Sequence, residues 1–251
     1  MNTIFEWIRQ IGPSDPEAEA AARLRWDTLA KPLGSLGVLE EDITRIAALR
    51  GSADVELAPR TLLVFCADND VVAQGVSQCG SEVTARVARA LAEGRSSVSP
   101  MARLAACAVL PVDMGIKDFK GCPGVLDRRV RNGSGDISLG HAMSREECLQ
   151  AMERGAELAH RQAQAGIRLL ALGEMGIGNT TSSAAVAAAL LNLPVSKVGG
   201  RGAGLSEEGL RRKRAAVERA LLCNKPDPHD PVDVLAKVGG LDLAAMCGAF
   251  L

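Results

Sequence analysis

The chain has 251 residues, of which 47% are hydrophobic and 24% charged, and its 29 basic and 30 acidic residues leave a formal net charge of −1. This composition is typical of a folded protein with one large domain, or one domain plus a small appendage. The balanced charge argues against nucleic-acid binding, which is typical of basic surfaces. The few aromatics, four Phe and two Trp with no Tyr, further disfavour single-strand binding, which uses stacking rings.

Signals for a membrane, for export and for metal binding are absent from the sequence. No apolar run reaches the roughly 18–20 residues that span a bilayer, and the first segment carries Glu6 and lacks the apolar stretch of a secretory signal. The seven cysteines form no C-x-x-C pair, and the three histidines lack metal-ligand spacing. We therefore predict a cytoplasmic protein with reduced thiols, no metal and no cofactor.

The first fifty residues have the pattern of helices. Ser14 and Glu17 fit a capping box, and Pro16 suits the first helical turn. A loop and then a polar, punctuated stretch follow, which predicts a small helical domain over 1–50 and a second domain over 51–251. The expected elements of the small domain are a helix over 18–29, a loop over 31–37 and a helix over 38–49.

After residue 60, apolar runs that are typical of buried parallel strands alternate with helical patterns. This alternation predicts an α/β fold with a mostly parallel sheet and flanking helices. Pro111 weakens the second strand, because proline cannot donate to a sheet ladder. The expected strands are 61–66, 108–113 and 167–172. The expected helices are 82–93, 98–107, 144–164, 180–191, 206–222, one opened by Asp230 and Pro231, and 241–251.

Several helix ends carry capping signals. Ser144 and Glu147 fit a capping box, and Ser81 and Gly94 are expected to cap and close the helix between them. The last helix, 241–251, is apolar and lacks a capping residue, which is typical of a helix that feeds another strand. We therefore expect a C-terminally incomplete domain with an exposed apolar face on this helix, an open sheet edge, and a tendency to aggregate.

The most informative segment follows the third strand and reads Gly173-Glu-Met-Gly-Ile-Gly-Asn-Thr-Thr181. Ligands of open α/β sheets bind beyond the carboxyl ends of the strands, and a glycine-rich helix start suits a phosphate. Asn179, Thr180 and Thr181 are expected to cap the following helix. The segment is neither a Walker A loop nor a clean G-x-G-x-x-G motif. Two interpretations stay open, a phosphate site and a tight strand-to-helix turn, and Glu174 favours the first because packing seldom needs an acid there.

Other groups near strand ends carry two interpretations each. The loop Gly199–Gly204, with Arg201 or Lys213 adding charge, is either an anion site or a flexible loop. Asp68 and Asp70 are either an acid/base pair or helix caps. Cys79 has no local base, which favours packing or pocket lining over a nucleophile.

At this point the motifs are similar to those of one family, the nicotinate-nucleotide–dimethylbenzimidazole phosphoribosyltransferases of cobalamin lower-ligand synthesis. The matching segments keep the family's order along the whole chain, and Gly173–Thr181 is highly specific. They are Lys31–Glu40, Cys66–Val71 with Gly75–Ser77, Glu82–Thr84, Gly140–Ser144, Gly173–Thr181, Gly200–Gly202 and Asp233–Gly240.

The resemblance implies a fold, an assembly and a reaction. The fold is a Rossmann-like, mostly parallel sheet with flanking helices, plus a small helical domain to which the N-terminal helices contribute. The assembly is a homodimer with its site at the carboxyl ends of the strands. The partners are nicotinate mononucleotide and a benzimidazole-type base, and the products are α-ribazole 5′-phosphate and nicotinate. A cationic pyridinium is already a good leaving group, so this chemistry requires no metal.

The resemblance also implies roles for individual residues. Glu174 would lie near the reacting base as the catalytic carboxylate. The residues that would bind the phosphoribosyl group are Gly176, Gly178, Asn179, Thr180, Thr181, Gly202 and Lys213. Those that would line the base pocket are Asp68, Cys79, Val83, Val87 and Met175.

Three departures from the family pattern matter. The family usually has Asp-His-Gly where this chain has Asp68-Asn-Asp70, and Ser- or Tyr-Pro where it has Cys79-Gly80; both leave the accepted base open. Family members also continue past residue 251 with a Gly-Glu-Gly segment whose Glu is taken as the general base. The chain is therefore expected to be part of an enzyme or, alternatively, a non-catalytic nucleotide- or ribazole-binding protein. An NAD-binding protein is disfavoured, because no acid follows the glycine loop at the spacing needed for the ribose.

Overall fold

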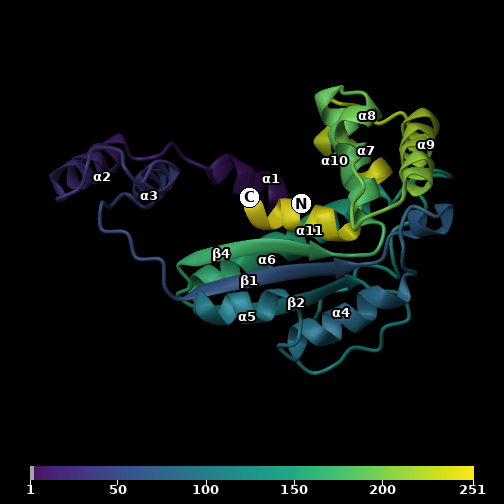
Figure 1. Ribbon diagram of the computed structural model, residues 1–251, viewed down its shortest axis with the longest axis horizontal. Coiled ribbons are helices and arrows are strands. Elements are labelled where there is room, and N and C mark those ends of the chain that lie inside the picture. Colours follow the sequence, from purple (N-terminus) through teal and green to yellow (C-terminus); the bar gives the residue numbers. More distant parts are fainter. Residues whose placement is uncertain (1–2) are drawn as a thin grey trace. The chain divides into compact units, whose positions relative to one another are not determined.

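The computed structural model describes residues 3–251 and divides into a smaller unit, Phe5–Ala58, and a larger one that contains Pro59–Leu251 (Figure 1). The larger unit is α/β, as the sequence predicts. Its four strands form one sheet in the order β3-β2-β1-β4, and every neighbouring pair is parallel. The strands are β1 (Arg60–Ala67), β2 (Cys107–Gly115), β3 (Leu126–Asp127) and β4 (Leu169–Met175).

The helices account for most of the remaining chain. The N-terminal ones are α1 (Thr3–Gln10), α2 (Pro16–Thr28) and α3 (Val38–Arg50). Those of the larger unit are the 3-10 helix η1 (Asp70–Gln74), α4 (Glu82–Ala92), α5 (Val98–Leu104), α6 (Arg145–Gln164), α7 (Asn179–Leu191), α8 (Val195–Val198), α9 (Glu207–Asn224), α10 (Pro231–Val238) and α11 (Leu241–Phe250). In the described residues, no helix has the length and apolarity needed to span a membrane.

The smaller unit is built on α2, α3 and the loop between them. Glu40 holds this loop, because its carboxylate lies 2.8 Å from the Lys31 ammonium and accepts the Leu36 N–H at 3.0 Å. The Lys31 ammonium also lies 5.6 Å from the centre of the Trp26 ring. The expected capping box at Ser14 is wrong, because Asp15 is the cap and accepts the first two free N–H groups of α2. The loop over 31–37 is confirmed.

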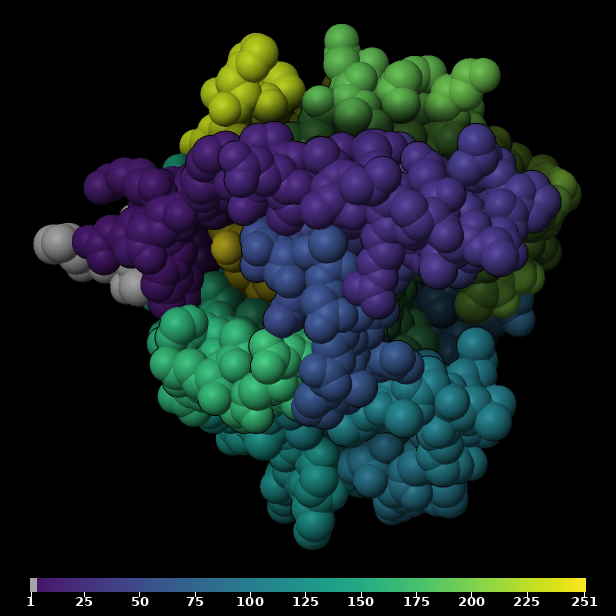
Figure 2. All heavy atoms as spheres, turned by 90° about the vertical axis from the view of Figure 1, so that its left-hand side faces the viewer, coloured from purple at the N-terminus to yellow at the C-terminus, as the bar shows by residue number. Residues whose placement is uncertain are grey.

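The surface of the smaller unit carries many exposed apolar side chains. Figure 2 faces its helices, which are coloured purple to violet. Single exposed apolar residues are common on folded proteins. The exposed residues of α2, α3 and their connection are Leu24, Leu29, Leu33, Leu36, Val38, Leu39 and Leu49.

The sheet confirms the three strands expected from the sequence and adds the short β3. Pro111 is tolerated inside β2 because it pairs only with Val64 of β1. On its other side β3 reaches only Val112 and Asp113, so no ladder bond from the proline nitrogen is required there. The sheet ends at β4, which pairs only with β1 among the described residues.

Helices cover both faces of the sheet (Figure 1). In this view α11 lies on one side of the strands, and α4 and α5 lie on the other. Helix α6 packs against α11 with almost no space between the two backbones. A Cβ on Gly155 would lie 1.9 Å from the Ala245 carbonyl oxygen, and a Cβ on Gly248 would lie 1.9 Å from the Met152 carbonyl oxygen.

This packing corrects one expectation about the last helix. The apolar face of α11 is not exposed, because Leu241, Ala244 and Ala245 are fully buried between α6 and the sheet. The exposed apolar side chain of this helix is Phe250, which is 74% accessible. The predicted tendency to aggregate stays a prediction.

The helix ends test the capping signals. The Ser144–Glu147 capping box is confirmed, and Asp230 caps α10 as expected. Ser81 precedes α4 but its side chain makes no cap bond, so that prediction is wrong. The helix expected over 98–107 ends at Leu104 instead, since Ala106 adopts a positive φ of 47° that turns the chain into β2.

Candidate functional site

The carboxyl ends of β1, β2 and β4 meet at one edge of the sheet because the three strands are parallel. Glu174 lies near the end of β4, opposite Phe65 of β1. The chain leaves β4 at Met175 and enters α7 through Gly176, Ile177 and Gly178. Helices α7, α9 and α10 pack together beyond this edge (Figure 1), so the predicted glycine segment lies between the sheet and a layer of helices.

Asn69 fixes this edge from within. It is buried, and its amide oxygen accepts a hydrogen bond from the Ser182 hydroxyl of α7 at 3.3 Å. Its backbone forms a bridge with Ser134. A Cβ on Gly178 would lie 3.0 Å from the Asn69 carbonyl oxygen. The departure from the family's usual Asp-His-Gly therefore places an amide side chain, rather than an imidazole, between β1 and the start of α7.

Glu174 is half-buried and accepts a hydrogen bond from the side-chain amide of Asn179. Burial raises the pKa of Glu174 above its ordinary value because desolvation disfavours the charged form. No described residue forms an ion pair with it. The expected acid at this strand end is thus present, oriented by the first residue of α7.

Lys213 is a buried lysine beside the first turn of α7. It is 1% exposed, and its ammonium donates a hydrogen bond to the Thr180 hydroxyl at 2.7 Å. No carboxylate among the described residues lies within ion-pairing distance of it, and burial lowers its pKa. The segment around Gly202 passes close by, because a Cβ on Gly202 would lie 3.3 Å from the Lys213 Nζ and 2.8 Å from the Thr180 hydroxyl.

The first turn of α7 differs from the expectation. Gly178 is the cap, in a left-handed conformation with φ of 96°, so Asn179, Thr180 and Thr181 are helical residues rather than caps. The Asn179 side chain nevertheless accepts the Thr180 N–H at 2.7 Å, and the Thr181 N–H donates to the Gly178 carbonyl. These N–H groups already have acceptors. Among the described side chains, the Lys213 ammonium has no ion-pair partner, and the Thr181 hydroxyl is buried without a hydrogen-bond partner.

Asp68 and Asp70 are not a pair of caps. Asp68 is buried and accepts the Lys117 N–H at 2.8 Å, while its second oxygen has no partner. Burial raises the pKa of Asp68, and the Thr84 hydroxyl and the Lys117 N–H oppose the shift. Asp70 forms an ion pair with the Lys117 ammonium. The two acids therefore clamp the segment after β2 onto the end of β1.

The residues predicted for a base pocket come from four places: Asp68 directly follows β1, Cys79 precedes α4, Val83 and Val87 lie on α4, and Met175 ends β4. Cys79 is exposed, and Val83 and Val87 are half-buried one helical turn apart. Val87 and Met175 pack against the same apolar cluster, which includes Ile116 and Phe119. The α4 helix is tied to the glycine segment, since the Ile177 N–H donates to the Thr84 hydroxyl at 3.1 Å.

The loop 199–204 is ordered by side chains. The Arg201 guanidinium donates to the Leu205 carbonyl at 2.7 Å and pairs with Glu207, so Arg201 is engaged locally. The Gln78 amide donates to the Ala203 carbonyl at 3.1 Å. Of the two cations considered for this loop, Arg201 forms an ion pair and Lys213 forms none with the described residues.

Sequence reasoning missed Asp242. It lies in the first turn of α11, is fully buried, and stands against Gly176 and Asn69. Burial, with the nearby Glu174 charge as the second cause, raises the pKa of Asp242 to about 7. The signal that would have found it is a lone acid in the apolar stretch Leu241–Met246, because a charge in such a helix needs a reason.

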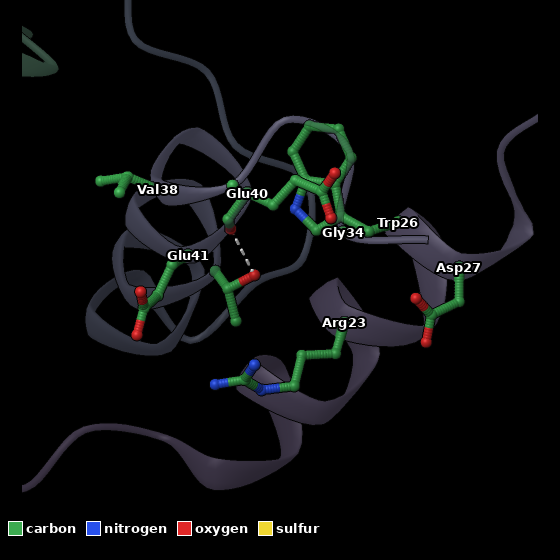
Figure 3. Close-up of a pocket in the computed structure, with 9 residues that line it drawn as sticks. Arg23, Trp26, Asp27, Gly34, Val38, Glu40 and Glu41 are labelled. Atoms are coloured by element: carbon green, nitrogen blue, oxygen red, sulfur yellow. Dashed lines mark hydrogen bonds between the residues drawn. The ribbon is translucent and has the colours of Figure 1, made fainter. Parts of the chain in front are cut away.

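A separate cavity of about 510 Å³ lies in the smaller unit, between α2, α3 and their connecting loop (Figure 3). Arg23 and Trp26 of α2 and Glu40 and Glu41 of α3 contribute to its lining. The dashed line in Figure 3 is the Thr44 hydroxyl donating to the Glu40 carbonyl, at 2.7 Å. None of the predicted site residues lines this cavity. In the described residues, no group of His, Cys, Asp and Glu could hold a metal ion.

Fold and site together define an α/β protein with a parallel sheet, and beside the ends of its strands lie a buried lysine, a glycine segment and several buried or half-buried carboxyls. Comparison with known proteins specifies the family. A family profile described as "Phosphoribosyltransferase" matches residues 11–251. A curated relative from Ruminiclostridium cellulolyticum, named nicotinate-nucleotide–dimethylbenzimidazole phosphoribosyltransferase, is 41% identical over 249 residues, which cover 99% of this chain and 71% of the relative.

A second relative and a solved structure, both from one organism, agree with this assignment. A relative of the same name from Thermus thermophilus is 47% identical over 238 residues, which cover 94% of this chain and 71% of the relative. A crystal structure of CobT from the same organism superposes with a TM-score of 0.88 at 46% identity, covering 94% of this chain and 71% of that one. The chain therefore belongs to the nicotinate-nucleotide–dimethylbenzimidazole phosphoribosyltransferase family, and the resemblance seen in its motifs is confirmed.

Proposed function

We propose that this chain transfers phosphoribose from nicotinate mononucleotide to 5,6-dimethylbenzimidazole or a related base. The products are α-ribazole 5′-phosphate and nicotinate, in the nucleotide-loop branch of cobalamin synthesis. Family membership supports this reaction. The base nitrogen attacks the anomeric carbon of the ribose while the bond to the pyridinium nitrogen breaks, so nicotinate leaves with the bonding electrons and the base loses its N–H proton.

The observation that carries the proposal is the buried Lys213 ammonium without an ion-pair partner in the described residues. A buried charge is costly unless it is paired. A phosphate bound beside Gly202 and Thr180 would supply the missing negative charge, and the Thr181 hydroxyl, buried without a partner, would supply a hydrogen-bond donor. The glycines at 176 and 178 let this segment pack directly against Ala67 and Asn69, which holds the start of α7 in place beside the proposed phosphate site.

The remaining roles follow from where the side chains lie. We propose that Glu174 faces the reacting base as the carboxylate of this chain, oriented by Asn179. Val83, Val87 and Met175 form the apolar side of the base pocket, with Cys79 at its exposed end. Asp68 supports the pocket from beneath, since it is buried and clamps the segment after β2.

We also propose a cytoplasmic homodimer with a small helical domain over 1–50 and a Rossmann-like domain over 51–251. The exposed apolar residues of α2, α3 and their connection support an interaction surface on the small domain. Light scattering at micromolar concentration tests the dimer: a monomer mass would contradict it.

The test of function is a mass-spectrometric assay of residues 1–251 with nicotinate mononucleotide and dimethylbenzimidazole. The relative from Thermus thermophilus is the positive control. Enzyme-dependent formation of α-ribazole 5′-phosphate is expected. Binding of nicotinate mononucleotide without turnover would instead support the alternative, a non-catalytic nucleotide- or ribazole-binding protein.

The phosphate site has its own test, which does not depend on turnover. Inorganic phosphate is expected to raise the Tm of the wild-type chain, because a ligand that binds only the folded state stabilises it. Lys213→Ala should abolish this shift, whereas Lys197→Ala, which changes an exposed lysine of α8, should retain it. An equal phosphate shift in both variants would refute the role of Lys213.

A further inference from the structure

Asp242 and Asn69 fill the space between two glycines. A Cβ on Gly176 would lie 2.9 Å from Asp242 Oδ2 and 3.0 Å from Asn69 Nδ2. A Cβ on Gly240 would lie 2.4 Å from Asp242 Oδ1 and 2.6 Å from Asn69 Oδ1. Neither glycine has a positive φ, so the missing side chains make room for these two polar groups. Asp242 is therefore placed directly behind the glycine segment of the site.

The two oxygens of Asp242 differ in their partners. Oδ1 accepts the Leu243 N–H at 3.0 Å. Oδ2 is fully buried and accepts no hydrogen bond, and it lies 2.9 Å from the Cβ position of Gly176. A buried carboxylate oxygen without a donor strongly disfavours the charged form. The geometry therefore suits a neutral carboxylic acid.

Glu174 of β4 and the Cys66 thiol of β1 are the titratable groups that interact with Asp242. Burial raises the pKa of that thiol, which stays neutral at physiological pH. In the part of the chain that the structure describes, no cation pairs with Asp242 or Glu174. Two neighbouring carboxyls in such surroundings do not both ionise at the same pH.

The two carboxyls are not equivalent. Glu174 is only half-buried, and the Asn179 amide donates to its carboxylate. Asp242 is fully buried, and its Oδ2 has no donor. Since a hydrogen bond to a charged form favours that form, the proton belongs on Asp242 and the charge on Glu174.

We propose that Asp242, buried behind Gly176 with an oxygen that has no donor, is a positioning residue of the phosphoribosyl-transfer site that stays protonated and thereby leaves the negative charge of the pair on Glu174. This inference rests on the proposed function. The neutral acid keeps the backbone at Gly176 in place without a second charge. The Lys213 ammonium, which has no ion-pair partner among the described residues, then faces the charge of Glu174 but not a second charge from Asp242.

The decisive variant is Asp242→Asn, which replaces the acid by a neutral amide of the same size. The pKa of Asp242 is raised in the folded chain, so the unfolded chain releases this proton near pH 4 and the folded chain near pH 7. Between these values the wild type loses stability as the pH rises. The quantity to follow is the unfolding equilibrium constant of the wild type divided by that of Asp242→Asn. This ratio is expected to grow about tenfold per pH unit within the window between about pH 4 and pH 7. It should level off at higher pH.

A matched control and a second variant make the test specific. Glu157→Gln makes the same carboxyl-to-amide change on the exposed side of α6 and should show no such window. Glu174→Gln removes the neighbouring charge, which should lower the folded-state pKa of Asp242 and move the upper end of the window to lower pH. If Glu174→Gln does not move the upper end of this window, the charge of Glu174 does not influence Asp242, and the proposed interaction of the two carboxyls is refuted.

The readouts are urea denaturation from pH 4 to 8.5 and calorimetric binding of nicotinate mononucleotide at pH 6 and 8. Affinity of the wild type is expected to fall relative to Asp242→Asn at the higher pH. An Asp242→Asn chain that is less stable than the wild type at pH 8, or a stability difference that does not change with pH, would overturn the proposal. If the pH window appears but the wild type binds no nicotinate mononucleotide at either pH, the proton assignment is supported and the proposed function fails.

Discussion

Two glycines in the same segment, Gly173 and Gly176, should respond oppositely to alanine. A Cβ on Gly173 would lie 3.8 Å from the Leu62 Cδ1, which is ordinary contact. A Cβ on Gly176 would lie 2.0 Å from the Ala67 carbonyl oxygen, and that obstacle is the backbone of the central strand. Gly176→Ala therefore forces β1 and the glycine segment apart, whereas Gly173→Ala requires no movement.

The magnitude follows from two opposing effects. Alanine in place of glycine within an element gains roughly 0.5–1 kcal/mol of stability. Overpacking costs about 1–3 kcal/mol, and we expect about 3 for Gly176→Ala because backbone must move. The net expectation is a loss of about 2 kcal/mol for Gly176→Ala and a gain of up to about 1 for Gly173→Ala. Displacement of the site by about 1 Å should also cost on the order of a hundredfold in turnover or affinity.

Urea denaturation of both variants measures the stability difference, and binding of nicotinate mononucleotide measures the displacement. Gly173→Ala is the internal control because it lies in the same segment and adds the same methyl group. A Gly176→Ala chain that is as stable as Gly173→Ala, and binds ligand equally well, would refute the steric argument.

Two further predictions concern stability outside the site. Gly155→Ala should destabilise the chain by about 1–3 kcal/mol because its Cβ meets the α11 backbone; Gly209→Ala, which meets only the flexible Leu205 side chain, should cost less in the same urea titration. Asp230→Ala removes the cap of α10 and an ion pair with Arg145, and should cost about 1 kcal/mol at pH 7. The pKa of Asp230 is lowered by the Arg145 hydrogen bond, so its contribution is present above about pH 4 and is lost as the pH falls; a difference that persists at pH 2 would contradict this.

Local patterns in the sequence predicted most of the fold. Apolar runs marked the three main strands, and helical periodicity with caps such as Ser144 and Asp230 marked helices that the structure confirms. Two wrong predictions concern helix caps for which several neighbouring polar residues were available. Asp15 rather than Ser14 caps α2, and Ser81 makes no cap bond, because several polar residues near a helix start can satisfy the same N–H groups.

The sequence by itself determined the three main strands, most of the helices, the parallel α/β class and the family, because these depend on local patterns such as the motif Gly173–Thr181. It did not predict the short elements β3, η1 and α8. The tertiary structure alone decided which distant groups share a buried space. It placed Asp242 of the last helix behind Gly176, and it buried the Lys213 ammonium beside Thr180 without a counter-charge in the described residues. Burial and charge pairing depend on atoms that arrive from elsewhere in the chain, and no sequence window contains them. The protonation of these groups is therefore a property of the fold.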